Sequence, residues 1–327
     1  MKDPKPFDVF SSSTERAVEQ TTKQVMAQTR GAWDTYFDFI QKAVSSFPSD
    51  GTELGGRVRS YTEQNIAAAK DYVGALSQAK DVQDVLYGKN GVCSQGGKMP
   101  PIVVDCSTIA VEESAAIRER LQQLGADFVA APVSGNAKVI KAGKLSAVVS
   151  GPEAACKIAT PLIEIFAPRG VSYVGGGELA RVCKIAHNVM LGVVIENLIE
   201  ITLLANKMGV PRHAFLAFMN NSVMGSIFTT YKGPAFVNLD FTPTFTPMLL
   251  RKDLDLGLAL GKQLDVPMPT SAAARDFLQA HMGQAKLKGG GYIDKDFATL
   301  LEFQAHCSGI EIKPENVEVW DGLSPKK

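Results

Sequence analysis

The first 85 residues carry apolar side chains at helical spacing. Val25, Ala32, Tyr36 and Ile40 are separated by seven or four residues, which places them on one face of a helix. The pattern breaks at Phe47-Pro48-Ser49-Asp50-Gly51, resumes, and continues to Val82 without a β-branched run that would indicate a strand. We therefore expect residues 1–85 to form a helical hairpin or part of a helix bundle.

Between residues 86 and 178 short apolar runs alternate with helical patterns. The runs at 101–105, 128–130, 146–150 and 171–174 have the length and composition of strands. The segments 117–124 and 154–166 between them have helical periodicity. This order predicts one end of an α/β sheet.

From residue 179 to residue 327 the pattern is almost wholly helical. It opens with a helix of nearly thirty residues that ends at Met208. Breaks are predicted near Pro211, Pro234, Pro267 and the segment 289–291. The fold class is therefore mixed, with a helical hairpin, an α/β segment and an all-α domain built on a long central helix.

Composition narrows the possible functions. The 327 residues include 34 Lys or Arg and 34 Asp or Glu, so the formal net charge is zero. Such a chain has no overall positive charge to attract nucleic acid, and we expect no nucleic-acid partner. The five cysteines form no CxxC pair and fit a reducing cytoplasm. No signal peptide is visible, and the apolar stretch 189–205 contains Glu196 and Glu200, so we expect no transmembrane segment.

Hydroxyl residues follow two of the predicted strands. Asp105-Cys106-Ser107-Thr108 and Ala131-Pro132-Val133-Ser134-Gly135-Asn136 would face the carboxyl edge of the sheet, where α/β folds bind ligands. An alternative for the first loop is that Ser107 or Thr108 only caps the next helix, with Glu112 or Glu113 in its first turn, and spacing alone favours this alternative. The second loop could equally be an ordinary turn.

Two polar residues lie on one face of the long helix. Lys184 and Asn188 are four residues apart in an apolar stretch, and a half-buried lysine with a lowered pKa can act as a general acid or base. The alternative is a lysine whose ammonium reaches solvent near the helix start. The charged segment 251–255 has the composition of a solvated helix start.

Two other motifs carry less weight. Gly175-Gly176-Gly177-Glu178-Leu179-Ala180 fits the GxGxxA spacing, but the helix after it is too long for a βαβ crossover, and we reject it as a dinucleotide site. The four histidines have no metal-ligand spacing and are expected to be ordinary structural or surface residues. We expect no metal.

Residues 86–322 resemble the β-hydroxyacid dehydrogenase family, which includes 3-hydroxyisobutyrate dehydrogenase and glyoxylate or succinic semialdehyde reductase. Four motifs in order carry the resemblance: 104–108, 131–135, Lys184 with Asn188, and Phe245 with Lys252-Asp253. The resemblance implies a partial Rossmann-like domain over 86–178 and the family's all-α domain over 179–327. It also implies a homo-oligomer and a small hydroxy acid or semialdehyde as substrate.

The resemblance also implies a role for each matching residue. Lys184 would be the general acid/base while hydride passes to or from NAD or NADP. The residues implied in substrate binding are Thr108, Ser134, Gly135, Asn188, Phe245 and Asp253. The residues implied near the cofactor are Ser107, Thr108 and Lys252.

The family's opening strand and GxGxxG turn have no counterpart before residue 86. Losing this turn removes the main contact with the pyrophosphate, so we expect weak or no nicotinamide binding and impaired activity. Segments 32–36, 60–69 and 76–83 instead resemble phasins, helical proteins that coat polyhydroxyalkanoate granules. The alternative function is therefore a granule-surface or partner-binding protein, made by fusion with a non-catalytic dehydrogenase remnant.

Overall fold

The computed structural model describes residues 81–89, 91–93 and 99–324, and it divides the chain into two compact units, Met1–Pro100 and Pro101–Lys327. In the first unit, helix α3 (Val82–Tyr87) begins where the Asp81 carboxylate accepts a hydrogen bond from the Asp84 amide at 2.8 Å. The expected division at residue 86 falls inside this helix. The predicted helical hairpin lies outside the described residues apart from its last few positions.

The second unit opens with an α/β layer. Its strands are β1 (Ile102–Asp105), β2 (Asp127–Ala130), β3 (Val133–Ser134), β4 (Ser146–Val149) and β5 (Val171–Tyr173). β1 pairs with β2 and β4 with β5 in parallel, whereas β3 runs antiparallel to β4. A bridge between Ala130 and Ser150 links β2 to β4. The four strands predicted from apolar runs are confirmed, and the two-residue β3 is an addition.

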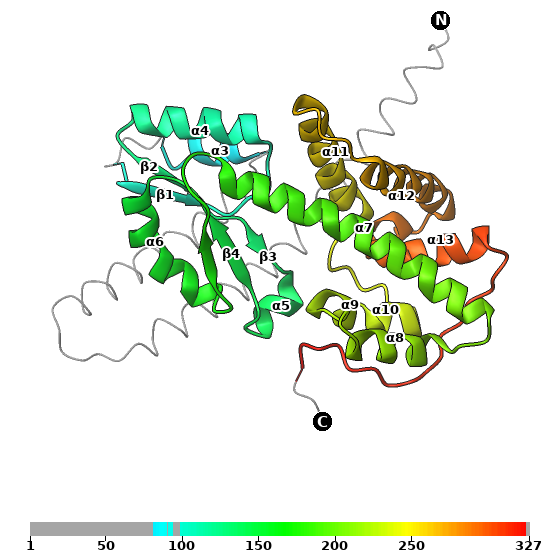
Figure 1. Cartoon of the computed structure of the whole chain (residues 1–327). Coiled ribbons are helices and arrows are strands. Elements are labelled where there is room, and N and C mark those ends of the chain that lie inside the picture. Colours follow the sequence, from blue (N-terminus) through cyan, green and yellow to red (C-terminus); the bar gives the residue numbers. More distant parts are fainter. Residues whose placement is uncertain (1–80, 90, 94–98, 325–327) are drawn as a thin grey trace, which may run out of the picture. The chain divides into compact units, whose positions relative to one another are not determined.

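Helices cover this layer. They are α4 (Val111–Gln123), α5 (Ala137–Lys141) and α6 (Glu153–Phe166), with α4 and α6 packed against β2 (Figure 1). Their apolar faces bury Ile117 and Ile163, while Val129 and Val149 are buried on the strands. The parallel strands with helices between them make this layer Rossmann-like.

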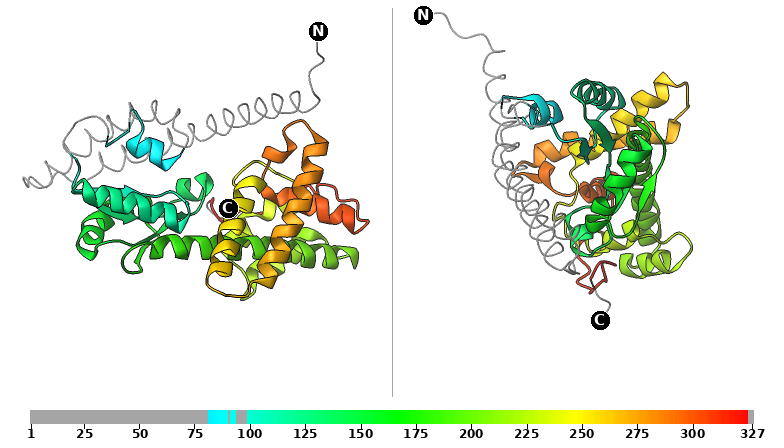
Figure 2. Two further views of the ribbon diagram at one scale, coloured as in Figure 1. Left: turned by 90° about the horizontal axis from the view of Figure 1, so that it is seen from above. Right: turned by 90° about the vertical axis from the view of Figure 1, so that its left-hand side faces the viewer.

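Helix α7 (Leu179–Lys207) joins the α/β layer to the helical part, which the two further views confirm (Figure 2). Its 29 residues confirm the predicted long helix. By length and composition alone it could cross a membrane, but half of its most apolar 18-residue window is buried. It also buries Arg181, Asn188 and Glu196, as the central helix of a folded domain does.

The rest of the unit is mainly helical up to residue 307, whereas residues 308–324, which the sequence pattern includes in the all-α domain, contain no helix. The elements are α8 (Arg212–Asn221), α9 (Ile227–Tyr231), α10 (Gly233–Asn238), α11 (Pro247–Gln263), α12 (Pro269–Lys288), the 3-10 turns η1 (Tyr292–Asp294) and η2 (Phe297–Thr299), and α13 (Leu300–Cys307). The predicted breaks near Pro211, Pro234, Pro267 and residues 289–291 are confirmed.

Two glycines let α7 and α11 approach closely. A Cβ added to Gly257 on α11 would lie 2.1 Å from Cγ2 of Val189, and one added to Gly192 on α7 would lie 2.8 Å from Cδ2 of Leu254. Both distances are far below van der Waals contact. This contact sets the spacing between the two helices next to Asn188, where the predicted site residues lie.

Candidate active site

The loop after β1 is held by an arginine on α7. The Ser107 hydroxyl donates to Oδ1 of Asp105 at 2.7 Å. The guanidinium of Arg181 donates to the Asp105 carboxylate and to the Ser107 carbonyl. Helix α4 follows Ala110, and no side chain caps it. The interpretation of Ser107 or Thr108 as a helix cap is therefore wrong: Ser107 turns back to Asp105 instead.

Arg181 is a residue that the sequence analysis missed. Its side chain is 1% exposed, donates to the Ser114 hydroxyl at 3.2 Å, and stacks over the Phe128 ring at 5.9 Å from its centroid. A buried guanidinium needs a paired carboxylate, which Asp105 supplies. Asp105 is 76 positions earlier in the chain, and no local spacing reveals such a pair.

The last residue of β3 contacts the first half of α7. The hydroxyl of Ser134 lies 3.0 Å from Nε2 of His187. Gly135 has a φ of 143°, and a Cβ there would lie 2.7 Å from side-chain carbons of Leu145 and Val139. Only glycine fits this conformation and this close approach. The turn at Gly135 therefore has a specific conformation, which holds Ser134 against α7.

Lys184 and Asn188 share a face of α7, as their spacing predicts. Asn188 is buried, and its Nδ2 donates to Oδ2 of Asp253 on α11 at 2.5 Å. The pKa of Lys184 is lowered to about 8, chiefly by burial. The Asp253 carboxylate raises this pKa, and the Lys252 ammonium lowers it. An amine with this pKa exchanges protons readily near neutral pH.

Helix α11 supplies the next two residues. The segment 251–255 is not a solvated helix start, because α11 begins at Pro247 and Asp253 is buried. Lys252 is exposed, and its ammonium donates to the Thr108 carbonyl at 2.9 Å and lies 3.0 Å from Oδ1 of Asp253. Lys252 therefore links the first loop to α11.

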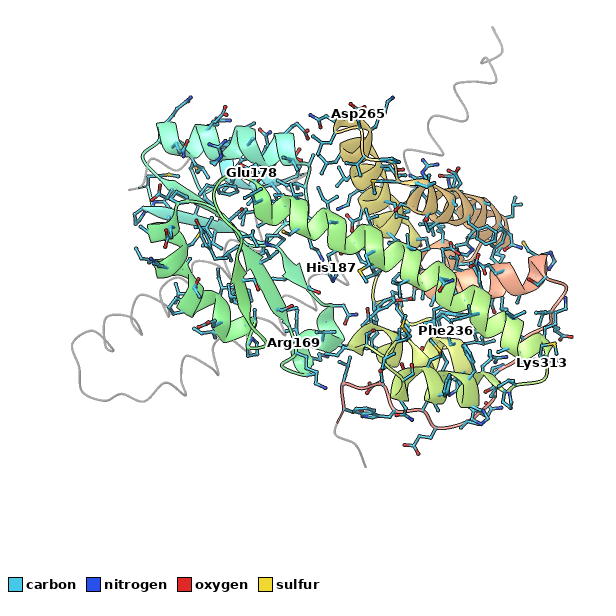
Figure 3. The ribbon with its side chains drawn as sticks, in the orientation of Figure 1. Arg169, Glu178, His187, Phe236, Asp265 and Lys313 are labelled. Atoms are coloured by element: carbon cyan, nitrogen blue, oxygen red, sulfur yellow. The ribbon has the colours of Figure 1, made fainter. Side chains whose placement is uncertain are left out.

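Together these contacts form one continuous chain, which we call the polar chain: Ser134, His187, Asn188, Asp253, Lys252 and Thr108. His187 joins its neighbours through a contact of 2.8 Å between Nδ1 and Oδ1 of Asn188. Figure 3 shows His187 on α7, between the α/β layer and the helical part. From the sequence His187 was predicted to be an ordinary structural or surface residue, although it lies three positions after Lys184 and directly before Asn188.

Two other predicted residues have different contacts. Phe245 is partly buried and packs edge-on against Phe297, with ring centroids 6.1 Å apart, in the helical core. Ser107 bonds to Asp105 and Arg181, so it holds the first loop in place and is not a member of the polar chain.

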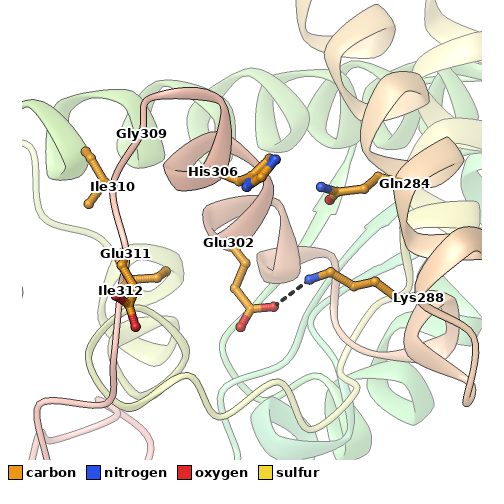
Figure 4. A pocket seen from close by; sticks show the side chains of 8 residues that line it. All are labelled: Gln284, Lys288, Glu302, His306, Gly309, Ile310, Glu311 and Ile312. Carbon is orange, nitrogen blue, oxygen red and sulfur yellow. Dashed lines mark hydrogen bonds and ion pairs between the residues drawn. The ribbon is translucent and has the colours of Figure 1, made fainter.

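Among the described residues, cavities also lie in the helical part, away from the polar chain. One of about 460 Å³ is lined by residues of α12, α13 and the segment after them, and an ion pair of Lys288 with Glu302 crosses it (Figure 4). Another of about 400 Å³ lies beside Glu196 on α7. Neither includes a residue of the polar chain. Within the described residues no group of three or more His, Cys, Asp or Glu side chains is placed to hold a metal ion.

Two family models match consecutive parts of the chain. Residues 179–303 match the model described as the NAD-binding of NADP-dependent 3-hydroxyisobutyrate dehydrogenase, and residues 24–175 match the NAD binding domain of 6-phosphogluconate dehydrogenase. The chain belongs to the β-hydroxyacid dehydrogenase family. The second match begins at residue 24, inside the segment for which the sequence suggests phasin-like helices.

Curated members of the family are similar over most of their length. The 2-hydroxy-3-oxopropionate reductase of Escherichia coli (strain K12) is 29% identical over 73% of this chain and 80% of its own. The 3-hydroxyisobutyrate dehydrogenase of Pseudomonas aeruginosa is 28% identical, over 75% and 83%. Glyoxylate/succinic semialdehyde reductase 1 of Arabidopsis thaliana is 28% identical, over 76% and 84%.

A solved β-hydroxyacid dehydrogenase has the same fold. The 3-hydroxyisobutyrate dehydrogenase of Salmonella typhimurium is 26% identical and covers 69% of this chain and 76% of its own, with a TM-score of 0.60. This likeness supports the Rossmann-like layer followed by a helical domain. The family models identify the cofactor class as NAD(P).

Proposed function

We propose that this family member is an oxidoreductase that interconverts a small hydroxy acid and the matching aldehyde or ketone acid, with Lys184 as the general acid/base. The observation that carries the proposal is the position of the half-buried Lys184 on α7, one helical turn before Asn188; burial lowers the pKa of its amine to about 8, while Asp253 raises it. When bound, NAD(P)H supplies a hydride to the carbonyl carbon. The Lys184 ammonium gives a proton to the carbonyl oxygen and is reprotonated from solvent, and the oxidation runs in reverse.

The polar chain supplies the substrate contacts in this proposal. Ser134 comes from the end of β3, and Asn188 comes from the turn of α7 that follows Lys184. With Thr108 and the Gly135 turn they would bind the carboxylate and hydroxyl groups, while Asp253 and Phe245 would close the pocket from the helical part. Preplaced donors of this kind stabilise developing charge with little reorganisation.

The described residues fit the nicotinamide end of the cofactor better than its pyrophosphate. Lys252, Ser107 and Thr108 give a cation and hydroxyls at the carboxyl edge of β1, as a nicotinamide site needs. Glycines 175–177 lie directly before α7, but the Glu178 side chain occupies this helix start, where its carboxylate accepts a hydrogen bond from Arg118 Nε at 2.8 Å. We therefore propose that cofactor binding is weak and that turnover is impaired. From the family resemblance and the cysteine content we further propose a cytoplasmic protein that forms homo-oligomers.

Calorimetric titration with NADH and NADPH tests this proposal, after circular dichroism has shown that the chain is folded. Weak or absent binding is expected, and a dissociation constant in the low micromolar range would contradict the impairment. If turnover of a hydroxy acid is detectable, Lys184→Ala should remove it. An unchanged rate in Lys184→Ala would contradict the role of Lys184.

The phasin-like alternative concerns residues 1–85. We propose it on the apolar stripe of the sequence, which needs a partner, a second copy or a granule surface to cover it. Flotation with polyhydroxyalkanoate granules tests it, and a chain that stays in the soluble fraction would count against granule binding.

A further inference from the structure

His187 lies between two residues to which the proposed function assigns substrate binding. Its Nε2 is 3.0 Å from the Ser134 hydroxyl, and its Nδ1 is 2.8 Å from Oδ1 of Asn188. We propose that His187 is a positioning residue whose protonation decides whether Ser134 donates its hydroxyl hydrogen to the substrate carboxylate. The proposal rests on the proposed role of Ser134 as a carboxylate ligand.

The contacts fix the tautomer of neutral His187. Asn188 must present its NH₂ to the Asp253 carboxylate, because a carboxylate can only accept, and so its Oδ1 faces the imidazole. An amide oxygen is an acceptor, which requires the hydrogen of the neutral ring on Nδ1. Nε2 then has a lone pair, and the Ser134 hydroxyl donates to it.

Ser134 therefore has two states. With neutral His187 its hydrogen points to Nε2, and only lone pairs remain for the substrate, which disfavours a carboxylate. With protonated His187 the ring donates from Nε2 to the Ser134 oxygen, and the hydroxyl hydrogen is free to bond the carboxylate. A hydrogen bond to a charged group is worth about 1.5 kcal/mol or more, so protonation should tighten carboxylate binding about tenfold.

The surrounding charges act in both directions. His187 is exposed, but desolvation by the surrounding atoms is the largest influence and lowers its pKa from the ordinary 6.5, and the Lys184 ammonium on the same helix lowers this pKa further. Asp253 on α11 raises this pKa, and so does the contact with Asn188. Lys252 lies 3.0 Å from Asp253 and offsets part of that carboxylate's charge. In the free chain His187 is therefore mostly neutral at pH 7, and carboxylate binding draws a proton onto it.

Carbon-edited NMR of the histidine Cε1–H groups in the full chain tests the coupling without any need for turnover. The probes are 3-hydroxypropionate and its uncharged amide, and His187→Asn assigns the resonance. We expect the acid to raise the pKa of His187 and the amide to leave it unchanged. Calorimetry in buffers of different ionisation enthalpy should show proton uptake with the acid alone.

Two variants separate this coupling from a structural role. Ser134→Ala should abolish the response of His187, and His187→Asn should abolish the tightening of acid binding as the pH falls. His306→Asn, at an exposed position near the end of α13, is the matched control and should keep both effects. The His281 resonance, from a buried ring bonded to Thr299, reports whether each variant is folded.

Two results would overturn the inference and are distinguishable. Acid binding with no change in the pKa of His187, or with the pH dependence intact in His187→Asn, overturns the role of His187 and leaves the proposed function standing. No binding of the acid by the folded chain at any pH overturns the assignment of Ser134 to the substrate, and the role of His187 with it.

Discussion

Lys184 is predicted to destabilise the fold that holds it. Its pKa is lowered from an ordinary value of 10.5 to about 8, chiefly by burial. A depressed lysine pKa means that the folded state disfavours the ammonium, so below about pH 8 the charge reduces stability. The shift corresponds to at most about 3 kcal/mol in the free energy of unfolding. Lys184→Met, which keeps most of the side-chain volume, should therefore stabilise the chain at pH 7 by about 1–3 kcal/mol.

The sign follows from the two titrations. As pH rises from about 8 towards 10.5, the wild-type lysine loses its proton in the folded state before the unfolded state does. The wild type therefore gains stability over that range, and the advantage of Lys184→Met should shrink. Urea denaturation at pH 7 and pH 10 measures both differences. A variant that is less stable than the wild type at pH 7, or a difference that does not change with pH, would refute the reasoning.

Lys232 provides the matched control. Its ammonium is buried, bonds to Oδ1 of Asp296 at 2.5 Å, and lies 4.0 Å from the centroid of the Phe297 ring. Lys232→Met leaves the buried Asp296 carboxylate without its cation, which typically costs about 3–5 kcal/mol. The same substitution is thus expected to have opposite effects at the half-buried Lys184 and the buried Lys232.

Two further predictions concern α11. Gly257→Ala should lower the free energy of unfolding by about 1–3 kcal/mol, because the new Cβ would lie 2.1 Å from Val189 Cγ2. Gly283→Ala, in open space on α12, should raise the free energy of unfolding by about 0.5–1 kcal/mol. Thermal denaturation compares the two variants, and equal midpoints would contradict the close approach of α7 and α11. Asp253→Asn should move the pKa of Lys184 below 8, because the carboxylate raises it; lysine-selective NMR titration measures the shift, and an unmoved pKa would contradict the influence of Asp253.

Local pattern predicted the elements that carry the site. The four-residue spacing of Lys184 and Asn188 correctly placed them on one helix face, and the apolar run 101–105 correctly placed Thr108 after a strand. Ser134, expected in the loop after the run 128–130, lies instead in the unpredicted strand β3. These signals depend only on backbone periodicity and on the alternation of strands and helices.

The partners of several site residues depend on tertiary contacts, which the sequence pattern does not reveal. His187 meets Ser134 across 53 positions, and Arg181 meets Asp105 across 76. Ser107 was expected to cap α4 because capping residues are common there, but the nearby guanidinium and the Asp105 carboxylate orient this loop instead. Asp253 lies in a charged segment whose composition is typical of a solvent-exposed helix start. Its burial follows from the close packing of α11 on α7 at Gly257.

The position of Arg181, Lys184 and Asn188 on α7 has a consequence for length changes in the chain. Each residue of an α-helix rotates the following side chains by about 100°. One residue inserted between Arg181 and Lys184 would leave the β1 loop attached to Arg181 and turn Asn188 away from Asp253. An insertion in the exposed turn at Gly143, by contrast, would leave every spacing on α7 intact. Between Arg181 and Asn188, tolerance to insertions is therefore limited by the register of α7.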